Sequence, residues 1–269
     1  MSWFEGIVLG IIQGLTEYLP VSSSGHLAIA GTFFGLEGND NMAFAILVHI
    51  ATILSTVVVL RQDIGGLFKG LFSFRWNDET KMITKLLISM IPVAIVGLFL
   101  KDTVEVFFGN GLFPVAIMLV VTSVILFISK FIKNTGKSDL SFRDAFFIGL
   151  AQACAVLPGL SRSASTIVIG IGLGNQREKV AKFSFLMVVL PVSGEAILDV
   201  VKVIKAGDIA AFSSLPAGMM AGGFLAAFIS GVFACKWMIE LVKRGKLLYF
   251  AIYCFLLGMF ALFYWYFGL

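Results

Sequence analysis

Apolar segments separated by short polar loops run through the whole chain, and they leave few folds open to it. The segments fall at residues 7–19, 22–35, 42–60, 84–100, 112–132, 145–157, 162–173, 183–204, 215–235 and 248–267. Only 13% of the residues are charged, whereas a soluble domain carries about 25%. A membrane admits only helices or closed barrels, and the sequence has no alternating strand pattern. The sequence therefore predicts an all-α polytopic membrane protein.

Some of these segments are too short to cross a bilayer, which takes about 20 residues per helix. The short segments form two pairs, 7–19 with 22–35 and 145–157 with 162–173. Each pair meets at a proline-containing break, PVSSSG at 20–25 and PGLSRS at 158–163. We therefore expect two re-entrant helix hairpins, at about 7–35 and 145–173.

The distribution of lysine and arginine supports these hairpins independently. The basic residues gather in the loops 61–81, 130–144, 174–182 and 236–246, and the other loops carry few or none. The positive-inside rule places the basic loops in the cytoplasm. Segment 145–173 then begins and ends on the cytoplasmic side, and by the same logic residues 1–35 enter and leave from outside. Six transmembrane helices remain, with both termini outside.

The two halves of the chain, about 1–140 and 141–269, resemble each other. GIIQ at 10–13 corresponds to GLAQ at 149–152, and PVSSS at 20–24 corresponds to PGLSRS at 158–163 with a one-residue gap. Because one hairpin enters from each side, the halves form an inverted-topology repeat within a single membrane domain, 1–269. Broken helices in such repeats meet near the midplane and bind the substrate there.

Composition excludes several classes of function. The net charge of +4 comes from basic residues in short loops, which does not indicate nucleic-acid binding. The chain has only two histidines, His26 and His49, which excludes a metal site built from several histidines. We expect His49 to pack in the core and the three cysteines to be small buried side chains. Glu195 and Asp199, with Lys202 nearby, are expected to form a local ion-pair cluster.

Serines stand at the start of the second half-helix of each pair: Ser22, Ser23 and Ser24 in the first, Ser161 and Ser163 in the second. Serine is a preferred N-cap, and helix N-termini offer unpaired N–H groups and the positive end of the helix dipole. Two such termini at membrane depth would bind phosphate. Arg162 strengthens this reading because a guanidinium matches phosphate oxygens bidentately. The alternative is that the serines only cap helices and Arg162 only reaches towards the interface.

The first break also carries an acid and a base. Gln13 and Glu17 lie one turn apart on the same helix face, and together they could hold a divalent cation with phosphate oxygens of a substrate. His26 follows the serines and is a candidate general acid, general base or phosphoryl acceptor. The alternatives are a glutamate paired with a lysine and a histidine that caps a helix.

These motifs resemble a known family. QGLTEYLPVSSSGH at 13–26 and PGLSRSAST at 158–166 are similar to the two signatures of the bacterial undecaprenyl-diphosphate phosphatases of the bacitracin-resistance type. The similarity extends over essentially the whole chain. It implies the inverted re-entrant architecture, a location in the bacterial inner (cytoplasmic) membrane, and hydrolysis of undecaprenyl diphosphate to undecaprenyl phosphate and inorganic phosphate. The lipid carrier is thereby recycled for cell-wall synthesis.

The resemblance also implies roles for individual residues. The catalytic residues would be Glu17, Ser23, His26 and Arg162, and Ser161, Ser163 and Thr166 would help to bind phosphate. From their places at the first break, we expect Gln13, Ser22, Ser24 and Gly25 to be substrate-binding residues as well. Glu17 would also bind a divalent cation, Mg²⁺ or Ca²⁺. The family often has a glutamate where this chain has Gln13, so Glu17 is the only carboxylate of the first motif here.

Several alternatives stay open at this point. Ser23 could be the nucleophile, with His26 or Glu17 accepting its proton, or His26 could accept the phosphoryl group directly. A transporter or flippase of a lipid-linked phosphate would share the inverted repeat. Lipid phosphatases of the phosphatidic-acid-phosphatase type need a second histidine after their Ser-Arg pair, and no histidine follows Arg162. The sequence leaves open a homodimer and the membrane face to which the site opens.

Overall fold

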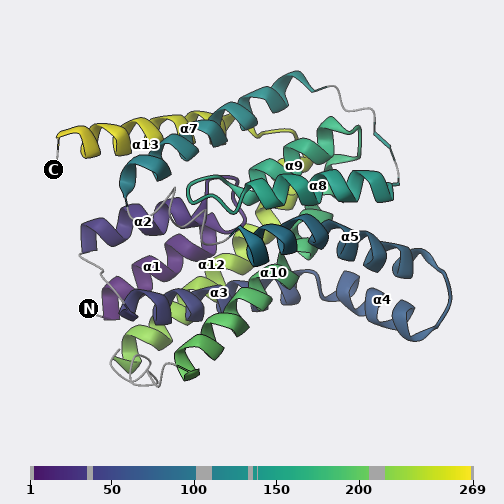
Figure 1. Cartoon of the computed structure of the whole chain (residues 1–269), viewed down its shortest axis with the longest axis horizontal. Helices are drawn as coiled ribbons and strands as arrows, with labels where there is room; N and C mark the ends of the chain where they lie inside the picture. Colours follow the sequence, from purple (N-terminus) through teal and green to yellow (C-terminus); the bar gives the residue numbers. More distant parts are fainter. Residues whose placement is uncertain are drawn as a thin grey trace.

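The computed structural model describes residues 3–34, 39–100, 111–132, 136–137, 139–205 and 216–267. These residues form eleven α-helices and one short 3₁₀ helix, and they contain no β-strand. One isolated backbone bridge joins Lys137 to Asn175. The predicted all-α architecture is confirmed for this part of the chain (Figure 1).

Every apolar segment recognised in the sequence contains a helix. The elements are α1 (Trp3–Thr16), α2 (Ser23–Phe34), α3 (Asn39–Val59), α4 (Arg61–Phe72), α5 (Asp78–Phe99), α7 (Leu112–Ile128), the 3₁₀ helix Ser129–Phe131, α8 (Phe142–Cys154), α9 (Arg162–Gly172), α10 (Arg177–Lys205), α12 (Ala217–Lys243) and α13 (Leu248–Phe267). The expectation that 61–81 is only a connecting loop was wrong. Its first part is helix α4, because Ile64 and Leu67 pack against the core.

Four helices in the described residues are long and apolar enough to cross a membrane: α5, α7 with its 3₁₀ extension, α12 and α13. A fifth candidate is α3 taken together with α4, although the chain bends by 78° between them. Large apolar side chains on the outward faces of these helices, such as Leu98 and Phe260, are exposed, as expected for side chains that face lipid. The chain is a multi-pass membrane protein.

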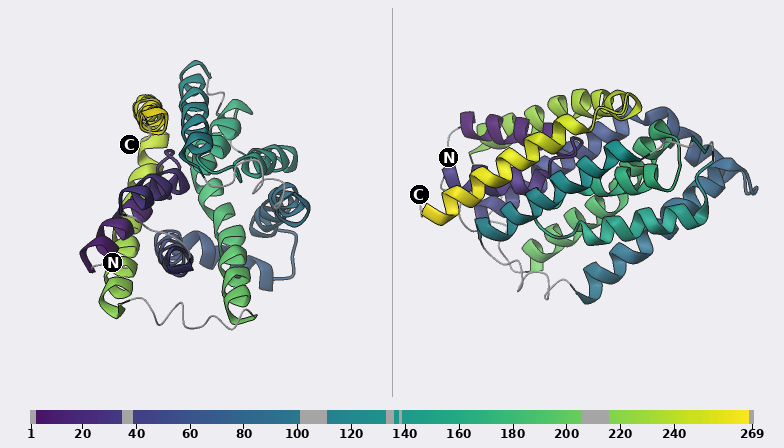
Figure 2. Two further views of the ribbon diagram at one scale, coloured as in Figure 1. Left: turned by 60° about the vertical axis from the view of Figure 1, so that its left-hand side comes forward. Right: turned by 90° about the horizontal axis from the view of Figure 1, so that it is seen from above.

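Helices of the two halves of the chain pack against each other. Helix α1 lies on α12, α8 lies on α5, and α7 lies alongside α13 (Figures 1 and 2). Small residues allow the close approach: Gly10 of α1 faces the backbone of Gly223, and Gly149 of α8 faces the backbone of Ser89. Gly10 and Gly149 are the corresponding positions of the sequence repeat, so equivalent glycines make equivalent helix contacts.

The segments rich in lysine and arginine lie together in the structure. Asp63 of α4 pairs with Lys182 at 3.4 Å, and Glu178 pairs with Lys243 at 3.1 Å. The ammonium of Lys137 donates to the carbonyl of Leu173 at 2.9 Å. In Figure 1 the α4–α5 hairpin and the start of α8 lie at one end of the molecule, and the start of α1 and the end of α13 lie at the other.

Some expectations fall outside the described residues or fail. Parts of three loops between the apolar segments lie outside them, at 36–38, 101–110 and 206–208, as do the side chains of Glu195 and Asp199. Cys235 and Cys254 are buried as expected, whereas Cys154 is exposed at the end of α8. The expectation for Cys154 was therefore wrong.

Candidate active site

Two breaks in the helices define the site. The first separates α1 from α2, and Ser22 within it has a left-handed backbone conformation, φ 68°. The second separates α8 from α9, and Gly159 within it has φ 91°. Such a conformation is strained for a serine and is common at functional sites. Ser22 Oγ accepts from Gly25 N–H at 3.2 Å and Ser161 Oγ accepts from Ala164 N–H at 3.2 Å, so each new helix begins with a serine cap.

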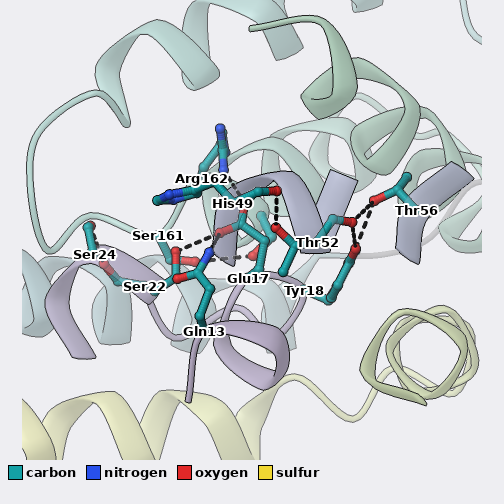
Figure 3. Close-up of polar contacts among 12 residues, drawn as sticks. Gln13, Glu17, Tyr18, Ser22, Ser24, His49, Thr52, Thr56, Ser161 and Arg162 are labelled. Carbon is teal, nitrogen blue, oxygen red and sulfur yellow. Dashed lines mark hydrogen bonds and ion pairs between the residues drawn. The ribbon is translucent and has the colours of Figure 1, made fainter. Parts of the chain in front are cut away.

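The two breaks contact each other directly. Ser163 Oγ donates to the Leu19 carbonyl at 3.2 Å, and Gly159 N–H donates to Ser24 Oγ at 3.4 Å. The N-termini of α2 and α9 therefore begin close together, and serines of both breaks face Glu17 and Arg162 (Figure 3). The sequence predicted this meeting of the breaks.

Glu17 is the residue on which the polar contacts converge. Its Oε1 accepts from Nη2 of Arg162, while Oε2 accepts from Ser23 Oγ at 2.8 Å and from Gln13 Nε2 at 3.0 Å. The Glu17 side chain is 4% exposed and that of Arg162 is 25% exposed. A buried carboxylate needs a paired charge and hydrogen-bond donors, and the second half of the chain supplies the charge.

Tyr18 fixes the backbone beside Glu17. Its hydroxyl donates to the Thr52 carbonyl at 2.5 Å and lies 2.8 Å from Thr56 Oγ1, both on α3 (Figure 3). The ring is fully buried and meets Phe185 of α10 edge to face. This contact holds the first break against α3 and α10, so Glu17 is carried on a rigid support.

A cavity of about 260 Å³ opens at the junction of the two breaks. Most of the predicted site residues line it, namely Glu17, Ser22, Ser23, Ser24, Ser161, Arg162 and Ser163. The wall also contains His49 and Gln152, which the sequence interpretation left out of the site. His49 was expected to pack in the core, and this expectation was wrong. The His49 ring lines the cavity, and its Nδ1 donates to the Ala45 carbonyl at 2.7 Å.

The remaining predicted residues lie outside the cavity wall. Gln13 donates a hydrogen bond to Glu17, and Gly25 belongs to the first turn of α2. Thr166 Oγ1 donates to the Arg162 carbonyl at 2.9 Å and lies 2.6 Å from Ser184 Oγ, so it steadies the helix that carries Arg162. Their direct contact with a substrate stays a prediction.

His26 does not line the cavity, and its ring contacts Tyr253. Its Nδ1 donates to the Ser22 carbonyl at 2.8 Å, and its Nε2 lies 2.7 Å from the hydroxyl of Tyr253 on α13. The two rings are stacked. Both ring nitrogens are therefore occupied, and the role of His26 in catalysis stays a prediction.

The oxygen ligands near Glu17 suffice for a metal ion only if the substrate supplies further ligands. Among the described residues, no three His, Cys, Asp or Glu side chains are grouped closely enough to hold a metal ion. Gln13 Oε1, however, is buried beside Glu17 and has no hydrogen-bond partner in the described part of the chain. One carboxylate and one amide oxygen suit Mg²⁺ or Ca²⁺ when phosphate oxygens complete the coordination.

Fold and site together define a class of protein: a multi-pass membrane protein with a polar cavity where two helix breaks meet. The comparison with known families is more specific. Residues 6–260 match the family described as "Bacitracin resistance protein BacA", and the chain belongs to this family.

Relatives of the chain carry a common name. A protein of Parabacteroides distasonis is 59% identical over 259 residues, 96% of this chain and 97% of the relative. One of Bacteroides thetaiotaomicron is 56% identical over 259 residues, with the same two shares. One of Methanobrevibacter smithii is 36% identical over 275 residues, 96% of each chain. All three are named undecaprenyl-diphosphatase.

Proposed function

We propose that this chain is a membrane-integral undecaprenyl-diphosphatase. It hydrolyses undecaprenyl diphosphate to undecaprenyl phosphate and inorganic phosphate and so recycles the lipid carrier for cell-wall synthesis. The observation that carries the proposal is the contact of Ser23 and Arg162, one from each half of the chain, with the same buried carboxylate of Glu17. The names of the relatives support the same activity.

The geometry supports Ser23 as the nucleophile and Glu17 as its base. Ser23 Oγ attacks the terminal phosphorus, the bond from that phosphorus to the bridging oxygen breaks, and undecaprenyl phosphate leaves. The proton of Ser23 passes to Glu17 Oε2, 2.8 Å away. Water then attacks the phosphorus of the phosphoserine, and the bond from phosphorus to Ser23 Oγ breaks. Glu17 returns its proton to Ser23 Oγ, and the inorganic phosphate that leaves contains the oxygen and both protons of the water.

Arg162 and the first N–H groups of α2 and α9 stabilise the negative charge of the transferring phosphoryl group. Arg162 already lies beside the cavity, because Glu17 holds its guanidinium there. A divalent cation, held by Glu17 and Gln13 Oε1 together with phosphate oxygens, would supply further positive charge.

The finer topology is part of the proposal: six transmembrane helices and two re-entrant hairpins in an inverted repeat. The equivalent glycine contacts of α1 and α8, the grouping of the basic segments and the meeting of the two breaks support it. We place the protein in the bacterial inner membrane, where the isoprenoid tail lies between helices or in the lipid and the diphosphate reaches the cavity.

Phosphate release by purified protein in detergent tests the function. The proposal predicts one inorganic phosphate and one undecaprenyl phosphate for each undecaprenyl diphosphate consumed, with little release by Arg162→Ala or Glu17→Ala. In detergent no membrane separates two sides, so a protein that only transports the lipid would release no phosphate. Full release by both variants would disprove the assignment of the site.

A further inference from the structure

Gln152 is a buried polar residue of the cavity wall for which the mechanism above has no use. It lies in the last turn of α8 and is 1% exposed. Neither its amide nitrogen nor its amide oxygen has a hydrogen-bond partner among the described residues. A buried amide without partners destabilises a folded protein, so a residue of this kind in a cavity wall indicates a ligand.

The corresponding residue of the first half shows what the amide can bind. Gln13 occupies the equivalent place in α1, and its Nε2 donates to the carboxylate of Glu17, four residues later, at 3.0 Å. Four residues after Gln152 the chain has Val156, which also lines the cavity. The second half therefore keeps the amide donor and has no carboxylate at the position where the first half has one.

The geometry points to Gln152 as a substrate-binding residue: its amide N–H donates to a non-bridging oxygen of the diphosphate. The anionic oxygen then takes the place that the Glu17 carboxylate takes beside Gln13. This inference rests on the proposed function and deepens it, because it assigns a phosphate contact to the wall formed by the end of α8. Arg162 begins α9 across the same cavity, so cation and amide reach the diphosphate from two elements.

Gln152→Leu tests the inference because it removes the amide at nearly constant volume. We expect KM for undecaprenyl diphosphate to rise by roughly 10- to 100-fold, the effect of losing one hydrogen bond to a charged group, with a smaller change in kcat. Thermal stability should stay the same or rise, since two unpaired buried polar atoms are removed. A purely structural role predicts the opposite: lower stability with an unchanged KM.

A second variant keeps Gln152 and supplies the missing carboxylate. Val156→Glu should place an anion beside the amide, as Glu17 does beside Gln13, and should also raise KM. Gln62→Leu is the matched control, because it removes an exposed amide on α4 far along the chain from both breaks. It should leave KM unchanged.

Binding of inorganic pyrophosphate, followed by the shift in melting temperature that it produces, separates this inference from the proposed function. We expect the shift in wild type and in Gln62→Leu, and a much smaller shift in Gln152→Leu at equal pyrophosphate concentration. If Gln152→Leu keeps both the wild-type KM and the wild-type shift, the inference is wrong and the phosphatase assignment stands. If wild type releases no phosphate but its pyrophosphate shift requires Gln152, the phosphatase assignment is wrong and the anion contact stands.

Discussion

Replacing Glu17 by glutamine removes the charge of this side chain and keeps its size. The amide oxygen can still accept from Ser23, but it cannot take a proton from it. Loss of a general base lowers kcat by roughly 100- to 10,000-fold, which corresponds to about 3–5 kcal/mol in the activation free energy. Arg162 loses its carboxylate partner but keeps its charge and a hydrogen-bond acceptor in the new amide, so KM should change much less than kcat. We therefore expect nearly the whole effect in kcat.

The same variant should destabilise the protein by a calculable amount. Removing one partner of a fully buried ion pair costs about 3–5 kcal/mol. Because a quarter of the Arg162 side chain is exposed, we expect about 2–3 kcal/mol, since solvent screens the charge left behind. Thermal unfolding of the purified protein measures this cost, and initial rates of phosphate release over a range of lipid concentrations separate kcat from KM.

Glu178→Gln is the matched control for this experiment. Its carboxylate pairs with Lys243 and is 43% exposed, so the substitution should cost less than about 1 kcal/mol and leave kcat unchanged. Folded Glu17→Gln protein with a kcat close to that of wild type would refute the reasoning, and so would a loss of activity that lies wholly in KM.

Three further predictions follow from other parts of the structure. Gly149→Ala should lower stability by about 1–3 kcal/mol, because its Cβ would meet the backbone of Ser89. Gly97→Ala should not, because none of the described atoms lies within 4 Å of a Cβ there; equal melting temperatures of the two variants would contradict the packing of α8 on α5. A chelator should abolish phosphate release, and Mg²⁺ or Ca²⁺ should restore it; full activity in the chelator would exclude the cation. The hydrogen bond from Lys85 lowers the pKa of Asp139 below its ordinary value of 3.8. The pair therefore stabilises the folded state fully at pH values above 3.8, and this contribution disappears as the pH falls through the lowered pKa of the folded protein. Asp139→Asn should therefore melt slightly below wild type at pH 7 and together with it under strongly acidic conditions; a gap that persists there would contradict the assignment.

The breaks could be predicted from the sequence because their signals are local. A proline after a short apolar segment ends a helix, and a serine at the next start caps one. The meeting of Glu17 and Arg162, 145 residues apart, followed from the repeat and from the grouping of the basic loops. The prolines, the serine caps, the repeat and the basic loops can all be read from a single sequence.

The other features depend on contacts that a single sequence does not reveal. Helix α4 carries charges and three glycines. Only its packing through Ile64 and Leu67 shows that it has an apolar face. A polar residue in an apolar helix looks the same whether it faces a cavity or the core, which is why His49 and Gln152 were missed. The direction of His26 is set by Tyr253, 227 residues away.

Rapid-quench analysis with undecaprenyl diphosphate labelled in the terminal phosphate tests the central claim most directly. The claim is that the phosphoryl group transfers to Ser23 at the junction of the two breaks. The account predicts an early burst of label on the peptide that contains Ser23, with neither label nor turnover in Ser23→Ala. Label on His26, or turnover of Ser23→Ala at the wild-type rate, would contradict it.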